Sequence, residues 1–165
     1  MKETRTLRVL GIDPGSHVTG YGIVESAASG LRCVLHGEIK PARGASLATC
    51  LRTICSGIQE TICRTTPEVM AIEDIFYGKN IRSLIKQGHV RGVAIWAGAD
   101  GGLSVYEYSP LEIKKAVVGY GRAEKGQVQM MVRAILKLPE LPPPDAADAL
   151  AVAICHIHFR KADAV

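Results

Sequence analysis

The chain has 165 residues, a length that suits one compact domain able to bury a core without disulfides or other staples. Hydrophobic residues make up 47% and charged residues 22%, and no stretch reaches the roughly 18 consecutive apolar residues of a membrane-spanning helix. We therefore expect one soluble domain over residues 1–165, and the formal charge of +4 allows a polyanionic partner without selecting one.

The N-terminal quarter predicts a meander of strands. The first strand is expected over residues 7–13, and no apolar signal region precedes it, which predicts a cytoplasmic protein. A second strand is expected over 19–26 and a third over about 31–39. The turn formers Pro14, Gly15 and Ser16 separate the first two strands.

An amphipathic helix is predicted next, from about residue 46 to 65, with Ser46 or Ala45 at its start. Its apolar residues recur at spacings of three and four: Leu47, Leu51, Ile54, Ile58 and Ile62. Three of the five cysteines, Cys50, Cys55 and Cys63, also fall in this segment, and the chain has no CxxC pair. We expect the cysteines to be buried, reduced thiols.

The rest of the chain predicts alternating strands and helices. Residues 69–75, after Pro67, form a β-favouring run typical of a central strand covered on both faces. Because a helix connects it to the opening strands, this strand is expected to pair in parallel. Further elements are expected in this order: a helix over 80–97, a strand over 103–108, helices from Pro110 and over about 124–136, and a last helix from near Asp145. This order predicts a three-layer α/β fold with a mixed sheet.

Two carboxylates end predicted strands. Asp13 closes the first strand, where α/β proteins usually build their sites, although a structural turn aspartate would explain it equally well. Glu73 lies inside an apolar run, where an unpaired carboxylate would be costly to bury. If the two strands are parallel neighbours, both side chains lie at the same edge of the sheet.

Two more carboxylates, Asp145 and Asp148, are three residues apart on the first turn of the last predicted helix and hence on one face. An N-cap role is the alternative for Asp145. The alanines that follow would let this helix approach the sheet closely: Ala146, Ala147, Ala149, Ala151 and Ala153. We therefore expect Asp145 and Asp148 to join Asp13 and Glu73.

Such a carboxylate cluster needs compensating cations. Hard oxygen ligands select Mg²⁺ or Mn²⁺, and two ions about 3.5–4 Å apart would support in-line cleavage of a phosphodiester. His156 and His158 lie about 10 Å further along the last helix, so they are interpreted as packing or surface residues rather than ligands.

Several motifs resemble the RuvC family of Holliday junction resolvases over about residues 7–158. They are Gly11-Ile12-Asp13-Pro14-Gly15-Ser16, Thr19-Gly20-Tyr21-Gly22, Ala71-Ile72-Glu73, Lys79-Asn80, Arg91-Gly92-Val93-Ala94, Val117-Val118-Gly119, Ala123-Glu124-Lys125 and Asp145-Ala146-Ala147-Asp148-Ala149-Leu150-Ala151. The resemblance implies a ribonuclease H-like fold and a homodimer that nicks two strands of like polarity at a four-way DNA junction. It also implies that Asp13, Glu73, Asp145 and Asp148 are the metal-binding catalytic residues.

The resemblance further implies DNA contacts. Phe76 matches an aromatic residue that stacks in the opened junction centre, with a core position at the strand end as the alternative. Lys114 and Lys125 match DNA-binding lysines. The remaining candidates are chosen from charge alone and would otherwise be a solvated face: Lys79, Arg82, Lys86, Lys115 and Arg122.

The helix over 80–97 carries Gly88 and Gly92 on one face, four residues apart. An interior helical glycine costs roughly 1 kcal/mol relative to alanine, which a close contact between helices would offset. The resemblance places a dimer contact on this helix, and a core-facing explanation remains open. It also implies a branch-migration complex of the RuvA and RuvB proteins as partner, in a bacterial cytoplasm near the nucleoid.

Two other classes of protein were weighed. An actin-like or Hsp70-like ATPase would share the first phosphate loop, residues 13–20, but the chain is too short for two lobes and offers no second phosphate loop. A non-catalytic junction-binding module would be expected to lack a metal ligand, and this sequence retains all four carboxylates.

Overall fold

A computed structural model describes residues 6–75 and 80–162 of the chain. In chain order the elements are β1 (Leu7–Asp13), β2 (Thr19–Ala27), β3 (Gly30–Ile39), α1 (Leu47–Thr65), β4 (Val69–Glu73), α2 (Ile81–Asp100), β5 (Ser104–Tyr108), α3 (Pro110–Val118), α4 (Lys125–Leu136) and α5 (Pro144–Ala162). None of the helices in these described ranges is long and apolar enough to cross a membrane.

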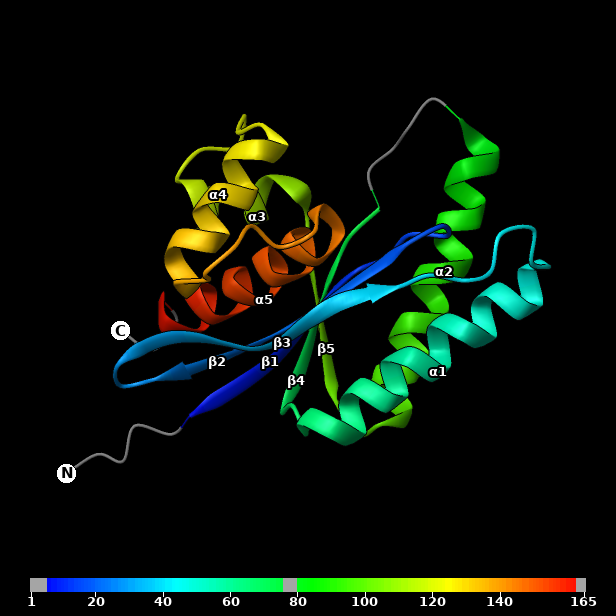
Figure 1. Ribbon diagram of the computed structural model, residues 1–165, viewed down its shortest axis with the longest axis horizontal. Helices are drawn as coiled ribbons and strands as arrows, with labels where there is room; N and C mark the ends of the chain where they lie inside the picture. The colour runs from blue at the N-terminus through cyan, green and yellow to red at the C-terminus, as the bar shows by residue number, and fades with distance from the viewer. Residues whose placement is uncertain (1–5, 76–79, 163–165) are drawn as a thin grey trace.

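The strands form one mixed sheet in the order β3-β2-β1-β4-β5. β1 pairs antiparallel with β2 and parallel with β4, and β4 pairs parallel with β5. Helices α1 and α2 cover one face of the sheet, and α3, α4 and α5 cover the other (Figure 1). The predicted three-layer α/β fold and the parallel pairing of residues 69–73 with the first strand are confirmed.

The core has two halves because neighbouring residues of a strand face opposite sides of the sheet. Along β1, Val9 packs in the cluster beneath α5, whereas Leu10 packs in the cluster beneath α1 and α2. In β4, Met70 and Ala71 divide in the same way. The central strands are therefore buried on both faces, which explains their continuous apolar runs.

Most element boundaries agree with the prediction. Ser46 caps α1, its hydroxyl accepting a hydrogen bond from the Thr49 amide. The predicted strand 69–75 instead ends at Glu73. Just beyond it, the Asp74 carboxylate accepts a hydrogen bond from the Ile75 amide at 2.7 Å, a local bond that replaces ladder pairing. The expected burial of the cysteines is wrong for Cys63, which is exposed on α1 one residue beyond the buried stripe.

Helix α5 lies unusually close to the sheet. Its alanines Ala146, Ala147, Ala149, Ala151 and Ala153 are buried, as predicted. Two strand glycines face it. A Cβ atom added at Gly11 would overlap the Ala149 carbonyl oxygen, and one added at Gly20 would overlap the Asp145 carbonyl oxygen. Small residues on both surfaces thus hold the first turn of α5 against the ends of β1 and β2.

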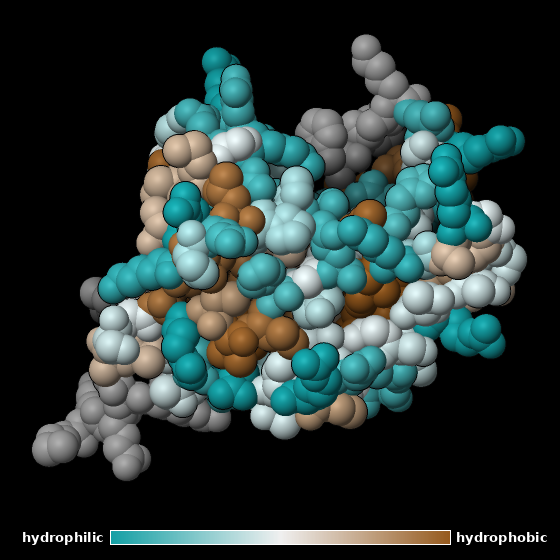
Figure 2. Space-filling model, viewed as in Figure 1, coloured by the Kyte–Doolittle hydropathy of each residue, from teal (hydrophilic) through white to brown (hydrophobic). Residues whose placement is uncertain are grey.

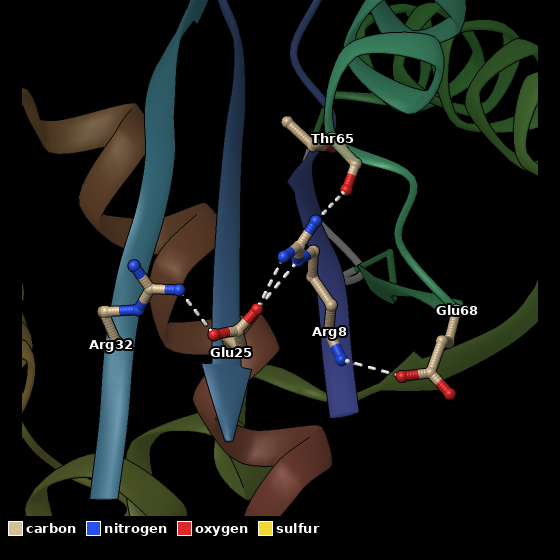
Figure 3. A network of polar contacts seen from close by, with 5 residues as sticks. All are labelled: Arg8, Glu25, Arg32, Thr65 and Glu68. Atoms are coloured by element: carbon tan, nitrogen blue, oxygen red, sulfur yellow. Dashed lines mark hydrogen bonds and ion pairs between the residues drawn. The ribbon is translucent and has the colours of Figure 1, made fainter. Parts of the chain in front are cut away.

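A polar network ties the opposite end of the sheet together (Figure 3). The Arg8 guanidinium donates to the Glu25 carboxylate at 2.6 Å and to the Thr65 carbonyl at 2.5 Å, and Arg32 donates to Glu25 at 2.6 Å. These bonds lower the pKa of Glu25, with the Arg32 hydrogen bond as the largest cause. The network joins β1, β2, β3 and the end of α1 and leaves the other edge of the sheet to the carboxylates.

Candidate active site

The parallel pairing of β1 and β4 brings the first two candidate carboxylates together. Ile12 lies opposite Ile72, so the next residues, Asp13 and Glu73, emerge side by side where both strands end. Their side chains share a hydrogen bond. The convergence expected from the sequence is therefore present, and it follows from strand register alone.

The first turn of α5 adds the other two carboxylates. Asp13, Glu73, Asp145 and Asp148 line one pocket of about 520 Å³, together with Lys114, Lys125 and Gln87. The site lies where β1, β4 and α5 meet, between α3 and α2 (Figure 1). In Figure 2, hydrophilic side chains flank the hollow at the top of the molecule.

The carboxylates in this pocket are starved of compensating charge. Burial, followed by the repulsion of Glu73 and Asp148, raises the pKa of Asp13 from 3.8 to about 8. Burial also raises the pKa of Glu73 and of Asp148, although Lys125 opposes the shift in both cases. Near neutral pH the metal-free site therefore retains a proton that a bound cation would displace.

Lysines form one wall of the pocket. Lys114 comes from α3 and Lys125 from the start of α4. The Lys125 Nζ atom lies 3.2 Å from the Asp148 carboxylate, which raises the pKa of Lys125. Of the other predicted DNA contacts, Arg82 is exposed on α2 outside the residues that line the pocket. Phe76 and Lys79 lie outside the described residues.

Sequence reasoning assigned no role to Arg91, although it stands in one of the family motifs. Its guanidinium donates to the Glu73 backbone carbonyl at 3.2 Å and pairs with the Asp74 and Glu107 carboxylates. The side chain is only 13% exposed. Arg91 thus fixes the end of β4 to α2 and β5. Its position in an otherwise apolar helix was the one available signal.

The donor set fits a hard divalent cation. Within the described residues, no group of three or more His, Cys, Asp or Glu side chains already surrounds a point where an ion would sit. Mg²⁺ commonly keeps several waters and uses only one or two carboxylates together with substrate phosphates. The shared proton of Asp13 and Glu73 marks the place where positive charge is missing.

The histidines of α5 have structural contacts, as predicted. His156 is buried against Tyr106, and its Nδ1 lies 2.8 Å from the Tyr108 hydroxyl. The Nδ1 atom of His158 lies 3.0 Å from the Ala116 carbonyl, which ties α5 to α3. Neither lines the carboxylate pocket.

The stability of the metal-free protein is expected to fall as pH rises from about 5 to 8. Folded Asp13 keeps its proton up to about pH 8, whereas the unfolded chain releases it near 3.8. The folded state therefore binds more protons in this window, and one such group lowers the free energy of unfolding by up to about 1.4 kcal/mol per pH unit. Thermal melts in EDTA should show a flatter pH dependence for Asp13→Asn than for the wild type. Equal slopes would contradict the raised pKa.

The fold and the carboxylate pocket together define a ribonuclease H-like nuclease. A family model described as "Crossover junction endodeoxyribonuclease RuvC" matches residues 9–156, most of the chain. The chain belongs to the RuvC family of crossover junction endodeoxyribonucleases, whose members are metal-dependent nucleases.

Relatives and solved structures agree with this membership. The chain is 50% identical over 153 residues to the RuvC of Caldanaerobacter subterraneus, a match that covers 92% of this chain and 93% of the relative. It is 53% identical over 158 residues to the RuvC of Koribacter versatilis, with coverage of 92% and 93%. The structure of Thermus thermophilus RuvC in complex with Holliday junction substrate superposes with a TM-score of 0.89 at 33% identity, covering 95% of this chain and 96% of that one.

Proposed function

We propose that this protein resolves four-way (Holliday) DNA junctions in recombination and repair, by paired symmetrical nicks on two strands of like polarity. The observation that carries the proposal is the pocket in which carboxylates from β1, β4 and α5 meet beside two lysines, in a chain of this family. The Thermus thermophilus relative with a bound Holliday junction substrate supports the choice of DNA structure.

The proposed catalytic residues are Asp13, Glu73, Asp145 and Asp148, and the proposed cofactors are two Mg²⁺ or Mn²⁺ ions. When bound, the ions would activate water and stabilise the leaving oxygen of the phosphodiester. Asp13 and Glu73 supply the most deeply buried oxygens, so they would place the metal at the sheet edge. Lys125 neutralises Asp148 and aligns it against the start of α4.

Contacts with DNA are proposed for Lys114 and Lys125, which face the pocket from the α3–α4 side. A cation in this place would hold the phosphates next to the cleaved bond. Arg82 is exposed on the first turn of α2 and would contact a more distant phosphate. The stacking role of Phe76 and the phosphate contact of Lys79 are proposed from the family resemblance alone.

A homodimer through α2 is supported by an apolar stripe on this helix. Ile81, Ile85 and Trp96 are 67%, 57% and 56% exposed, large fractions for apolar side chains. At helical spacing they share one side with Gly88 and Gly92. A Cβ added at Gly92 would meet no described atom within 4 Å, so Gly92 does not face the core of its own chain. A two-fold axis there would give two active sites for two equivalent strands.

Gly92→Glu is expected to convert the dimer into a monomer, because a charge would be buried in the apolar contact without a partner. Sedimentation of the purified proteins measures the change. The matched control is Ser83→Glu, which adds the same charge on the opposite, exposed side of α2. A dimer that survives Gly92→Glu would place the interface elsewhere.

The remaining assignments rest on the family resemblance. They are a single nuclease domain over residues 1–165, a cytoplasmic location near the nucleoid, and the RuvA–RuvB branch-migration complex as a partner. Co-sedimentation of the protein with RuvA and RuvB on a four-way junction would test the last of these.

Cleavage of a synthetic mobile four-way junction beside linear duplex tests the function itself. Symmetrical nicks on the junction alone, in Mg²⁺ or Mn²⁺ and not in EDTA, are the expected result. Junction binding without cutting in either metal would favour a non-catalytic junction-binding module. Equal cutting of linear duplex would contradict selectivity for the junction.

A further inference from the structure

A second hollow, of about 660 Å³, adjoins the active site. It lies between the loop that joins β1 to β2, the loop that joins β3 to α1, the start of α1, and α2. Figure 2 shows hydrophilic side chains gathered over α2 and the β3–α1 loop at the upper right of the molecule. We call this hollow the basic groove. The basic residues that line it are His17, Lys40, Arg43 and Lys86.

The basic groove has a single sign of charge. Its four basic side chains are all exposed, and no Asp or Glu occurs among its described lining residues. Lys40 pairs with the Glu38 carboxylate at 2.5 Å, but Glu38 itself lines a different hollow. That other hollow holds two arginines together with Glu38 and Glu60, so its charges offset one another. Only the basic groove combines concave shape with unopposed positive charge among these two.

The start of α1 adds to the positive field. Ala45 and Leu47 line the basic groove, which places the positive end of a 19-residue helix dipole there. The first turn of α1 carries no acidic residue that would counter this field. The walls are also tied together, because the buried Cys50 thiol donates to the Ser16 carbonyl at 3.3 Å.

The basic groove is continuous with the carboxylate pocket. Val18 lines both hollows. On α2, the neighbouring residues Lys86 and Gln87 line the basic groove and the carboxylate pocket, respectively. The carboxylates therefore stand between two sets of cations, with Lys114 and Lys125 on the α3–α4 side and the basic groove on the α1–α2 side.

We propose that the basic groove binds the phosphate backbone of a duplex arm of the DNA junction, on the side of the cleaved phosphate opposite Lys114 and Lys125. This inference rests on the proposed function and adds a binding site to it. Phosphates follow one another along each strand at one per 3.4 Å of helix rise, so a strand that leaves the active site would pass several charges along the groove. Such contacts position the arm without reading its sequence.

The test is junction binding by the full-length double variant Arg43→Gln/Lys86→Gln, measured in Ca²⁺ or EDTA over a series of salt concentrations. Neither residue has an ion pair within the described part of the chain that would complicate the substitution. Two lost phosphate contacts should reduce the slope of log affinity against log salt by about 1.8 and lower affinity roughly 50-fold at 0.1 M salt.

The matched control is Arg52→Gln/Arg64→Gln, which removes the same charge from the hollow that also contains carboxylates. Its salt slope should equal that of the wild type. An unchanged slope for Arg43→Gln/Lys86→Gln, or an equal loss in both double variants, would overturn the basic groove as a site. Because binding is measured without cleavage, this result is independent of whether the wild type cuts the junction, and melting temperatures confirm that each variant folds.

Discussion

Glu73→Gln is expected to lower the rate of junction cleavage by at least about 10³-fold while junction binding is retained. Glutamine keeps the shape of the side chain but removes its negative charge, so the site loses a ligand at the place where β1 and β4 deliver their carboxylates. A loss of this size corresponds to about 4 kcal/mol of transition-state stabilisation, as expected for a group that positions a catalytic metal. Single-turnover cleavage at saturating enzyme separates this effect from binding.

The matched control for this experiment is Glu140→Gln, the same chemical change at an exposed residue between α4 and α5. Its cleavage rate should remain within about twofold of the wild type, as surface substitutions away from special features are usually mild. If Glu73→Gln also cut the junction at nearly the wild-type rate, the assignment of the carboxylate pocket as the catalytic centre would be wrong.

Gly11→Ala is expected to lower the free energy of unfolding by about 3 kcal/mol. The added Cβ would overlap the Ala149 carbonyl oxygen and lie 2.9 Å from the Ala153 nitrogen, both backbone atoms of α5 that cannot rotate away. Overpacking of a tight core typically costs 1–3 kcal/mol, and contact with backbone places this case at the upper end. For a chain of this size the melting temperature should fall by about 6–12 °C.

Gly126→Ala provides the comparison, because the same methyl group at this helical position would meet no described atom within 4 Å. Replacement of a helical glycine by alanine there should leave stability unchanged or raise it by up to about 1 kcal/mol. A melting temperature for Gly11→Ala equal to that of the wild type would mean that α5 can move away from the sheet without cost.

Much of the fold could be predicted because it depends on neighbours along the chain. Apolar spacing of three and four located α1, and Ser46 marked its start. The apolar run that ends in Glu73 indicated a central strand, and the alanines after Asp145 indicated a helix packed closely on the sheet. The candidate carboxylates were likewise visible as polar residues at element ends. Their roles in catalysis remain predictions.

Other features could not be predicted because they join segments distant in sequence. Arg91 reaches the backbone of Glu73 only because α2 crosses the end of β4, and no local pattern announces that contact. Cys63 occupies an apolar spacing on α1 but faces outward, since the helix turns about 100° per residue and the buried stripe is narrow. The cations of the basic groove come from separate loops and α2.

The amino-acid sequence by itself determined which segments are strands and helices, because hydrophobic periodicity and capping act over a few residues. It also determined which side chains carry acid and base. Tertiary structure alone decided that Asp13 and Glu73 share a proton, that α5 lies against Gly11 and Gly20, and that two sets of cations flank the carboxylates. These outcomes depend on strand register and helix packing, which arise from contacts across the whole core rather than from any one stretch of the chain.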